Sequence, residues 1–272
     1  MKRTLLTLAL LATPVCAMAD KIDDLKAQGF VRIAIANEPP FTAVAADGTV
    51  SGAAPDVARE IFKRLGVPEV VASISEYGAM IPGLQAHRHD VITAGLFMKP
   101  ERCEAVAYSE PVLCDAESFL LPKGNPKGFK SFADIANDPT AKIGAPGGGT
   151  EEKLALDAGV PRDRVIVVPD GQSGLKMLQD GRIDVYSLPV LSISDLMKKA
   201  DDPNLEMFAP VEGAPVYCDG AAFNKDDTAL RDAFDVELAK MKESGEFAAI
   251  IEPYGFSAAA AKSTSRATLC GE

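Results

Sequence analysis

One short pattern occurs twice in this chain and constrains its fold more than any other feature. The pattern Leu-Gln-x-x-Arg-x-Asp-Val begins at Leu84 and returns, with identical internal spacing, at Leu178. Each copy follows a segment with helical spacing of its apolar residues and leads into a short apolar run typical of a strand. A helix, a turn and a strand that recur in the same order indicate two units of related topology. The chain is therefore expected to fold as two lobes, each with its own sheet.

Strand and helix signals alternate through both halves of the chain. Short apolar runs predict strands over residues 31–36, 70–74, 91–94, 142–145, 165–168 and 184–187. The segments between them predict helices over residues 56–65, 80–85, 131–135, 151–157 and 174–179. Apolar strands separated by helices indicate parallel sheets that are covered by helices on both faces. The expected fold class is therefore α/β.

The chain is expected to cross between the two lobes twice, near residues 108–114 and again near residues 217–223. A long helical segment from Thr228 then carries one apolar stripe, which would pack back on the first lobe. The predicted first lobe comprises residues 20–112 and 218–272, and the predicted second lobe comprises residues 113–217. Two crossovers make a hinge, and the cleft between hinged lobes is where an enclosed ligand is expected.

The N-terminus is typical of an export signal. Two basic residues precede an apolar run over residues 5–12 that is too short to cross a membrane, and residues 17–19 supply the small side chains before a cleavage site. The predicted signal peptide spans residues 1–19, and the exported chain begins at Asp20. Lipid attachment at Cys16 is the alternative. No later segment is apolar for about 18 residues, so the exported chain is expected to act, soluble, in the periplasm.

Composition excludes several partners. The chain is 47% hydrophobic and 25% charged, as in an ordinary globular protein, and its formal net charge is −11. A surface of that sign repels nucleic acid and anionic lipid, so neither is expected as a partner. His87 and His89 are interpreted as part of a surface turn rather than as metal ligands, because no cysteine lies nearby. Neither a metal nor another cofactor is expected.

Four cysteines follow the predicted signal peptide, namely Cys103, Cys114, Cys218 and Cys270. An even number in an exported chain, without a Cys-x-x-Cys pair, indicates disulfides rather than a metal site. Three pairings exist. Cys114–Cys218 with Cys103–Cys270 is favoured, because Cys114 and Cys218 lie in similar strand contexts that would be neighbours. Unpaired buried thiols are the alternative.

Several segments resemble one known family over nearly the whole exported chain. The stretches IANEPPF, GLFMKPERCEAVAYSEPV and GRIDV, with a glycine-rich turn before Thr150, look like the periplasmic binding proteins of polar amino acid ABC importers. More closely, IANEPPFTAV, SISEYGAMIPGLQA and APGGGTEEKLAL resemble the binding proteins for ectoine and 5-hydroxyectoine. This resemblance implies a two-lobed periplasmic binding protein fold, a hinge crossed twice, an ABC transporter permease as partner, and no catalysis.

Two features are expected to bind a ligand carboxylate. Arg102 follows a predicted strand end, where open α/β sheets bind ligands, and a guanidinium fork suits a carboxylate. The resemblance implies the same role, while an ion pair with Glu101 or Glu104 is the alternative. The glycines around Gly148 and the helix start at Thr150 offer backbone N–H groups to an anion, with Thr150 also able to cap the helix. A plain strand-to-helix turn is the alternative there.

Three aromatic residues and one carboxylate are expected to surround the positive charge of the ligand. Phe41, Tyr77 and Phe97 lie at predicted strand-to-helix connections in a chain with only 6% aromatic residues. Aromatic faces bind a delocalised cation, with about 0.5–2 kcal/mol for each desolvated contact. Glu38 lies close before Phe41 and would balance the charge. Each aromatic residue alone is more often a core residue, and the three together at predicted cleft positions favour an aromatic box.

A departure from the amino acid binders of the family concerns the ligand itself. These binders usually carry an aspartate beyond the GRxD strand for the primary ammonium group, whereas this chain has Ser187, Leu188 and Pro189. Phe97 also stands where they often have a small hydroxyl residue. These differences favour a cation spread over a ring, as in the amidine of ectoine.

Three functions compete at this point. The first is capture of a small zwitterion by lobe closure, by a monomer that contacts the membrane only through its permease. The second is binding of a polar or cationic amino acid. The third is a periplasmic dehydratase-like enzyme in which Glu38 or Glu151 acts as acid or base. A nucleophile–base pair and a metal set are both missing from the sequence, so the chain is expected not to be an enzyme.

Overall fold

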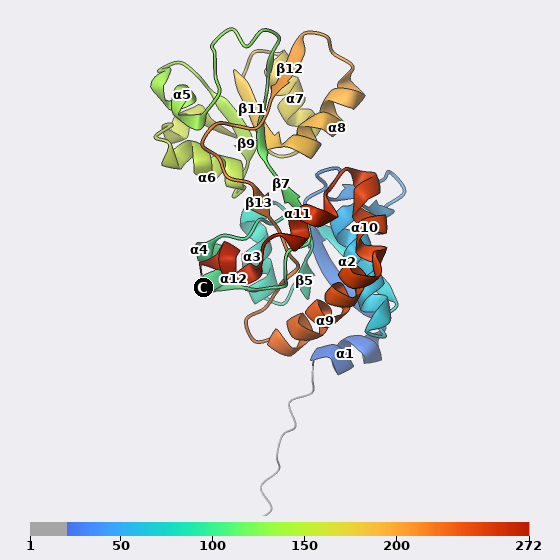
Figure 1. Cartoon of the computed structure of the whole chain (residues 1–272). Coiled ribbons are helices and arrows are strands. Elements are labelled where there is room, and N and C mark those ends of the chain that lie inside the picture. The colour runs from blue at the N-terminus through green and yellow to red at the C-terminus, as the bar shows by residue number, and fades with distance from the viewer. Residues whose placement is uncertain (1–20, 272) are drawn as a thin grey trace, which may run out of the picture.

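The chain folds into two lobes that lie one above the other in Figure 1 and are joined by a pair of short strands. The computed structural model describes residues 21–271. The predicted signal peptide, with the alternative lipid site at Cys16, lies outside these described residues. Both lobes contain a five-stranded sheet. The predicted α/β fold with two lobes is therefore confirmed.

The first lobe is built on the sheet β4-β1-β5-β14-β6. Its strands are β1 (Phe30–Ile35), β4 (Glu69–Ile74), β5 (Val91–Ile92), β6 (Ala107–Tyr108) and β14 (Ala222–Phe223), and a small hairpin adds β2 (Ala43–Val44) and β3 (Val50–Ser51). Its helices are α1 (Lys21–Gln28), α2 (Ala53–Arg64), α3 (Tyr77–Gln85), α4 (Pro100–Ala105), α9 (Thr228–Ser244), α10 (Glu246–Ile251), α11 (Ala258–Lys262) and α12 (Arg266–Cys270).

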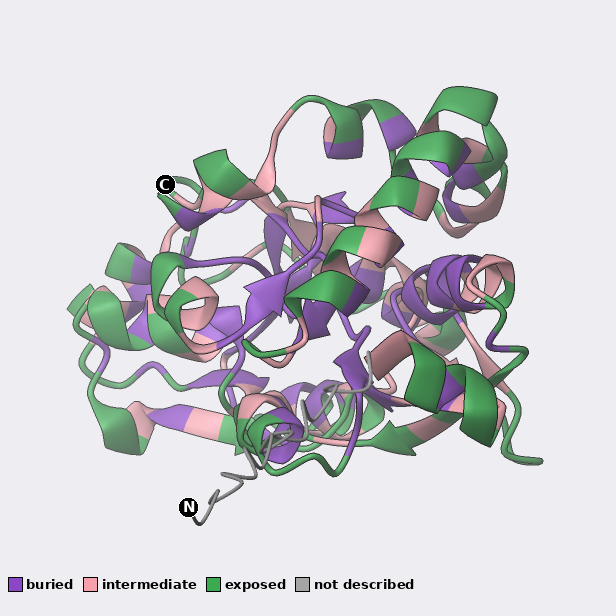
Figure 2. Cartoon of the chain, turned by 90° about the horizontal axis from the view of Figure 1, so that it is seen from below, coloured by how far each residue is buried: buried purple, intermediate pink, exposed green. Residues whose placement is uncertain are grey.

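The second lobe is built on the sheet β10-β9-β11-β8-β12. Its strands are β8 (Glu117–Pro122), β9 (Ile143–Pro146), β10 (Val165–Val168), β11 (Val185–Pro189) and β12 (Leu205–Phe208), and its helices are α5 (Phe132–Asn137), α6 (Thr150–Asp157), α7 (Gly171–Gln179) and α8 (Val190–Ala200). Figure 2 shows buried residues concentrated in the strands and on the inner sides of the helices.

Both sheets are mixed rather than parallel throughout, which corrects the prediction. β1 pairs in parallel with β4 and β5, but β14 runs antiparallel to β5 and β6. In the second lobe β8 likewise runs antiparallel to β11 and β12. The antiparallel strands β8 and β14 are the first sheet strands that the chain forms after each crossing of the hinge. Their direction is set by the crossover, which the local apolar pattern does not encode.

The repeated sequence pattern has a structural cause. The Asp90 carboxylate accepts the backbone N–H of Arg32, while the Asp90 N–H donates to the Arg32 carbonyl. Asp184 makes the same two contacts with Lys142 at the start of β9. In each lobe, the aspartate lies just before a strand and joins it to the neighbouring strand. The repeat therefore reports a shared way of pairing two strands.

The C-terminal helix packs back on the first lobe, as predicted. Helix α9 buries Leu230, Phe234, Leu238 and Met241 against the first-lobe core, and Gly245 follows it in the left-handed conformation, with φ 87°. Only a residue without a Cβ adopts this angle at little cost, which fixes the end of the helix. The stripe predicted from sequence spacing is therefore the buried face.

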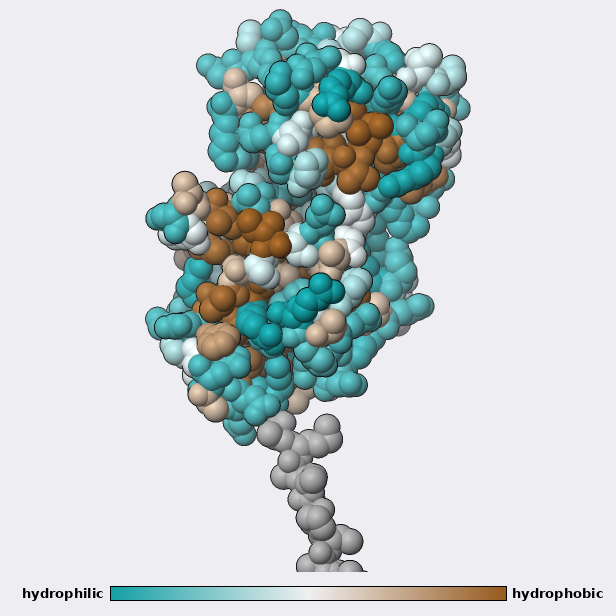
Figure 3. All heavy atoms as spheres, turned by 180° about the vertical axis from the view of Figure 1, so that it is seen from behind, coloured by the Kyte–Doolittle hydropathy of each residue, from teal (hydrophilic) through white to brown (hydrophobic). Residues whose placement is uncertain are grey.

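Two strands form the hinge, at the waist visible in Figure 3. β7 (Cys114–Asp115) enters the second lobe and β13 (Tyr217–Cys218) leaves it, and the two pair antiparallel with Cys114 opposite Cys218. Disulfides join Cys114 to Cys218 and Cys103 to Cys270, so the predicted pairing is confirmed. We keep residues 20–112 with 218–272, and residues 113–217, as the proposed extents of the lobes.

One sequence interpretation is wrong. His87 is exposed in the turn, but His89 is 5% exposed, and its Nε2 lies 2.9 Å from the Met80 carbonyl. Burial lowers the pKa of His89. The ring fills the space beside Gly83, where a Cβ would lie 2.5 Å from it. His89 is thus a core residue rather than a surface one, because α3 folds over it.

Within residues 21–271, no helix is both long enough and apolar enough to span a bilayer.

Candidate ligand site between the lobes

The residues predicted to bind the ligand converge on a chamber between the two lobes. The chamber has an empty volume of about 250 Å³. Its wall consists of Glu38, Phe41, Tyr77, Gly95, Phe97 and Arg102 from the first lobe, and of Gly149, Thr150, Glu151 and Pro189 from the second. Gly148 is the one predicted residue that is absent from this wall. Segments far apart in the sequence thus meet at one enclosed site.

Arg102 projects from α4 and joins the two lobes. One guanidinium nitrogen donates to the Phe97 carbonyl at 2.8 Å, and another donates to the Gly148 carbonyl of the second lobe at 2.9 Å. Within the described chain, Arg102 bonds to these two carbonyls and forms no ion pair with Glu101 or Glu104. A guanidinium carries five N–H donors, so further donors remain for an anion in the chamber.

The aromatic part of the wall is ordered by ring contacts. Phe41 and Phe97 meet edge to face with centroids 5.9 Å apart. Phe97 also stacks on Tyr217 of the hinge strand β13, at 5.6 Å and an interplanar angle of 17°. Lys99 lies over the other ring of that stack, with its Nζ 5.5 Å from the Tyr217 centroid. Sequence reasoning missed Tyr217, whose place depends on the return crossing of the chain.

Glu38 is held by hydrogen bonds from both lobes. The Tyr77 hydroxyl lies 3.2 Å from Glu38 Oε2, and Ser192 of α8 donates to Glu38 Oε1 at 2.7 Å. Burial, with the nearby charge of Glu151, raises the pKa of Glu38 to about 8, against the effect of these hydrogen bonds. Sequence reasoning also missed Ser192. The Ser192 bond joins the two lobes, so both bonds hold the Glu38 carboxylate only while the lobes are together.

The glycine-rich turn is arranged differently from the prediction. Gly149 is the N-cap of α6 without a side-chain bond, and Thr150 is the first helical residue rather than the cap. The Gly148 N–H donates to Glu152, and the Gly149 N–H donates to the Pro146 carbonyl. These two donors are therefore occupied within the turn. Gly148 contributes its carbonyl to Arg102, and Gly149 and Thr150 are the members of the turn that line the chamber.

Glu151 brings a second carboxylate to the chamber wall. It is 4% exposed, and burial raises its pKa, while its own helix-start N–H groups and the charges of Lys99 and Arg102 oppose that rise. Lys99 is 8% exposed, and burial together with the charge of Arg102 lowers its pKa to about 8. Near the chamber, the first lobe therefore supplies two cationic groups, Lys99 and Arg102, and the second lobe supplies the acidic Glu151 at the start of α6.

Glu117 is a third carboxylate near the chamber, and no sequence motif singles it out. It begins β8, pairs in register with Pro189 of the chamber wall, and is 1% exposed. The sequence argument about the missing aspartate considered only residues 187–189, which lie in strand β11. The structure places a carboxylate on the neighbouring strand instead, so the absence of an acidic group from residues 187–189 is weaker evidence about the ligand than it was from sequence.

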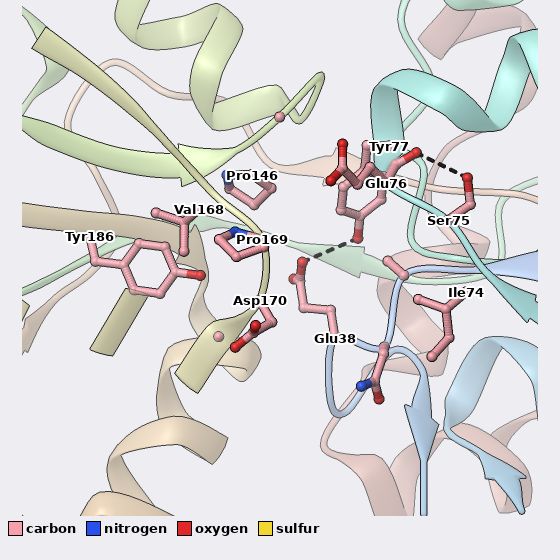
Figure 4. A pocket seen from close by; sticks show the side chains of 14 residues that line it. Glu38, Ile74, Ser75, Glu76, Tyr77, Pro146, Val168, Pro169, Asp170 and Tyr186 are labelled. Atoms are coloured by element: carbon pink, nitrogen blue, oxygen red, sulfur yellow. Dashed lines mark hydrogen bonds between the residues drawn. The ribbon is translucent and has the colours of Figure 1, made fainter. Parts of the chain in front are cut away.

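A larger chamber adjoins the first one at Glu38 and Tyr77, which line both. Figure 4 shows its two walls, with Ile74, Ser75 and Glu76 on one side and Pro146, Val168, Pro169, Asp170 and Tyr186 on the other. Its empty volume is about 480 Å³. The hydrogen bond between Tyr77 and Glu38 lies where the two spaces meet, so these side chains separate the inner chamber from the outer one.

The lobes touch directly beside the inner chamber. The Gly78 N–H donates to the Gly147 carbonyl at 3.2 Å, and Gly148 approaches so closely that a Cβ on it would lie 2.4 Å from the Gly78 Cα. The approach requires a glycine at position 148, whereas a Cβ on Gly78 would lie at an ordinary 3.6 Å from the Gly148 Cα. With the bridges from Arg102 and Ser192, these contacts define a closed arrangement of the lobes.

Replacing Gly148 with alanine is expected to hold the lobes apart. Gly148 has φ 72°, and its added Cβ would meet the backbone of Gly78 in the closed form. Overpacking of this kind costs roughly 1–3 kcal/mol, which corresponds to an affinity about 5- to 150-fold weaker. Titration of the ligand and small-angle scattering of the loaded protein would test this.

Gly181→Ala is the matched control, because Gly181 has φ 68° but no atom within 4 Å of its Cβ position. It is expected to bind as the unaltered protein does. Equal affinities for the Gly148 and Gly181 variants would show that the closed contact does not contribute to binding.

A double-stranded hinge and a chamber enclosed by both lobes define a class, the binding proteins that trap a small solute between two lobes. Comparison with known proteins places the chain within this class. Residues 31–257 match the bacterial extracellular solute-binding proteins, family 3, and the chain belongs to this family. The family resemblance drawn from the sequence is thereby confirmed.

Three similar proteins are informative. A probable amino-acid ABC transporter periplasmic-binding protein, y4tE of Sinorhizobium fredii, is 35% identical over 92% of this chain and 84% of its own length. The crystal structure of EhuB in complex with hydroxyectoine is 83% identical, with a TM-score of 0.92, over 92% of this chain and 98% of that one. An ancestral arginine-binding protein bound to arginine is 27% identical, with a TM-score of 0.73, over 83% and 98% respectively.

Proposed function

We propose that this chain is the solute-binding component of an ABC importer and that it captures ectoine or hydroxyectoine in the periplasm. The observation that carries the ligand assignment is the 83% identity to EhuB, whose crystal structure contains hydroxyectoine. The importer role is supported by the family and by the relative from Sinorhizobium fredii, a probable amino-acid ABC transporter periplasmic-binding protein.

The chemistry of the chamber supports a compact zwitterion. Arg102 supplies a guanidinium for the carboxylate, and Thr150 faces it from the second lobe. Phe41 and Phe97 offer ring faces and edges to a delocalised cation, and Glu38 lies in the same wall, where a bound cation would favour its ionised form. A cyclic amidine with one carboxylate has both charges on a small frame and could meet Arg102 and Glu38 at once.

The proposed mechanism is capture by closure. The ligand first meets Arg102 and the aromatic residues of the first lobe. The second lobe then brings Thr150 and Ser192, so that Glu38 and Arg102 are fixed by partners on both sides. The closed monomer would dock on an ABC transporter permease, which is its only contact with the membrane. Nucleic acid is not a partner, because the chain carries a net charge of −11.

A polar or cationic amino acid is the second candidate ligand. The observation in its favour is the acidic outer chamber, which Glu38, Glu76 and Asp170 line without a lysine or arginine among its wall residues. Relatives that bind arginine share the fold at 27% identity. A dehydratase-like enzyme is less well supported, because the similar proteins named here are transport components. We propose binding without chemical conversion.

Calorimetric titration of the chain from Asp20 onward tests the proposed function. Ectoine, hydroxyectoine, glycine betaine, proline, glutamate and arginine would be compared. We expect tight one-to-one binding of the two cyclic amidines. Phe97→Ala is expected to weaken it by roughly 2- to 30-fold, as about 0.5–2 kcal/mol for a desolvated aromatic contact implies. Tight binding of arginine without the cyclic solutes would contradict the ligand assignment and leave the family intact.

A further inference from the structure

Glu117 is the one buried carboxylate near the chamber that has no hydrogen-bond partner. It is 1% exposed, and in the described chain both of its carboxyl oxygens are buried without a donor. An ionised carboxylate that is removed from water without hydrogen bonds is strongly disfavoured. Burial accordingly raises the pKa of Glu117 well above its usual value.

The other acidic groups of this region are compensated. Glu38 accepts from Ser192 and has Tyr77 within hydrogen-bond distance, and these bonds limit the rise of its pKa by burial to about 8. Asp115 accepts backbone N–H groups from Leu191 and Ala116, which limit the rise of its pKa to about 6.

Glu151 lies at the start of α6 and faces the charges of Lys99 and Arg102. Glu117 therefore differs from its neighbours by having neither hydrogen bonds nor a close ion pair. Protonation is therefore the simplest way for Glu117 to become neutral.

The charges that surround Glu117 come from both lobes. Glu151 belongs to the second lobe and Asp115 to the hinge strand β7, whereas Glu38 and Lys99 belong to the first lobe. Burial and the charge of Glu117 together raise the pKa of Tyr217 in β13 to about 12. When the lobes separate, the first-lobe groups withdraw and water reaches the mouth of the second lobe. The surroundings of Glu117 thus depend on closure.

From this geometry we propose that Glu117 takes up one proton each time the lobes close on the ligand, and that it remains in the closed site as a neutral acid. This inference depends on the proposed function only because it requires a ligand that closes the cleft. It assigns to Glu117 a role beside the chamber that neither sequence reasoning nor the comparisons assign. A neutral carboxyl group donates and accepts one hydrogen bond, whereas three ionised carboxylates around one ligand cation would repel each other.

The sign of the pH dependence follows from linkage. Closure raises the pKa of Glu117, so the closed, loaded form binds more protons than the open form. Binding is then strongest at low pH and weakens as pH rises above the ordinary glutamate value, until the pKa of the closed form is reached. Within that window one proton per ligand makes the dissociation constant rise about tenfold per pH unit.

Calorimetry in two buffers measures the proton directly. Hydroxyectoine would be titrated near pH 7 in phosphate and in Tris, whose enthalpies of ionisation differ, so the difference in heat gives the number of protons taken up. We expect up to about two protons per ligand for the unaltered chain, one on Glu117 and one on Glu38, whose pKa burial raises to about 8. Glu117→Gln, which is neutral and of the same shape, is expected to reduce this number by about one and to make the pH dependence less steep. Asp115→Asn is the matched control and should leave the uptake unchanged above about pH 7.

The outcomes separate the two proposals. Failure of hydroxyectoine to bind would overturn the proposed function. Tight binding without proton uptake would overturn the role of Glu117 alone. Binding that Glu117→Gln weakens strongly, again without uptake, would show Glu117 to be an ionised acceptor for the ligand cation, which also contradicts the inference. An uptake that is the same in a folded Glu117→Gln protein, checked by circular dichroism, as in the unaltered chain would assign the proton to other groups such as Glu38.

Discussion

Replacing Arg102 with alanine is expected to weaken the binding of hydroxyectoine by about two to three orders of magnitude. The variant removes the proposed partner of the ligand carboxylate and the bridge to the Gly148 carbonyl. Truncating one partner of a buried charge pair costs roughly 2–5 kcal/mol, largely because the other charge is left unpaired. Calorimetric titration measures the loss.

Two controls separate the roles of this side chain. Glu101→Ala changes an exposed neighbour on the same helix and is expected to leave the affinity unchanged. Arg102→Lys keeps the charge but loses the fork, so an intermediate loss is expected. An uncharged carboxamide analogue of the ligand tests the carboxylate contact, because it should bind the unaltered protein and the alanine variant about equally. An alanine variant that binds hydroxyectoine within about threefold of the unaltered chain would refute the clamp.

Removing the hinge disulfide is expected to destabilise the protein by roughly 2–5 kcal/mol. Cys114 and Cys218 are 104 residues apart in sequence, and a crosslink over that length restricts the unfolded chain by about 5 kcal/mol in the chain-entropy description. The double variant Cys114→Ser, Cys218→Ser should unfold about 10 °C lower, since 1 kcal/mol shifts the midpoint by about 2–4 °C in a chain of this size. Thermal unfolding without ligand measures this, because a bound ligand adds its own stabilisation.

The second disulfide provides a matched comparison. Cys103 and Cys270 are 167 residues apart and join α4 to α12 inside the first lobe, away from the paired hinge strands. Their double serine variant should lose a similar amount of stability. A change of less than about 1 kcal/mol for the hinge pair would mean that the pairing of β7 with β13 holds the crossing without the covalent bond.

Local patterns were sufficient for much of the architecture. The predicted strands near Val31, Val70 and Val165 and the helix from Thr228 agree with the structure to within a few residues. Each of these elements has a strong periodic signal whose apolar side chains become buried. The cysteine pairing followed from the similar contexts of Cys114 and Cys218, which are in fact register partners.

Part of the candidate site was also within reach of sequence. Phe41, Tyr77, Phe97 and Arg102 follow or flank predicted strand ends, and the structure brings them together on the first-lobe wall of one chamber. Open α/β sheets place such loops at a common edge. Their ligand-binding roles stay predictions, which the variants described above would test.

The sequence by itself determined the α/β class, the two related lobes and the double crossing, and it favoured the disulfide pairing, because each leaves a local or repeated signal in the chain. Only the tertiary structure decided which polar groups surround the chamber. Ser192, Glu117 and Tyr217 adjoin its wall residues Glu38, Pro189 and Phe97, and they come from a helix, a strand and a hinge strand that carry no motif. Burial and hydrogen bonding between residues distant in sequence depend on how the lobes are placed, and periodicity contains no information about that placement.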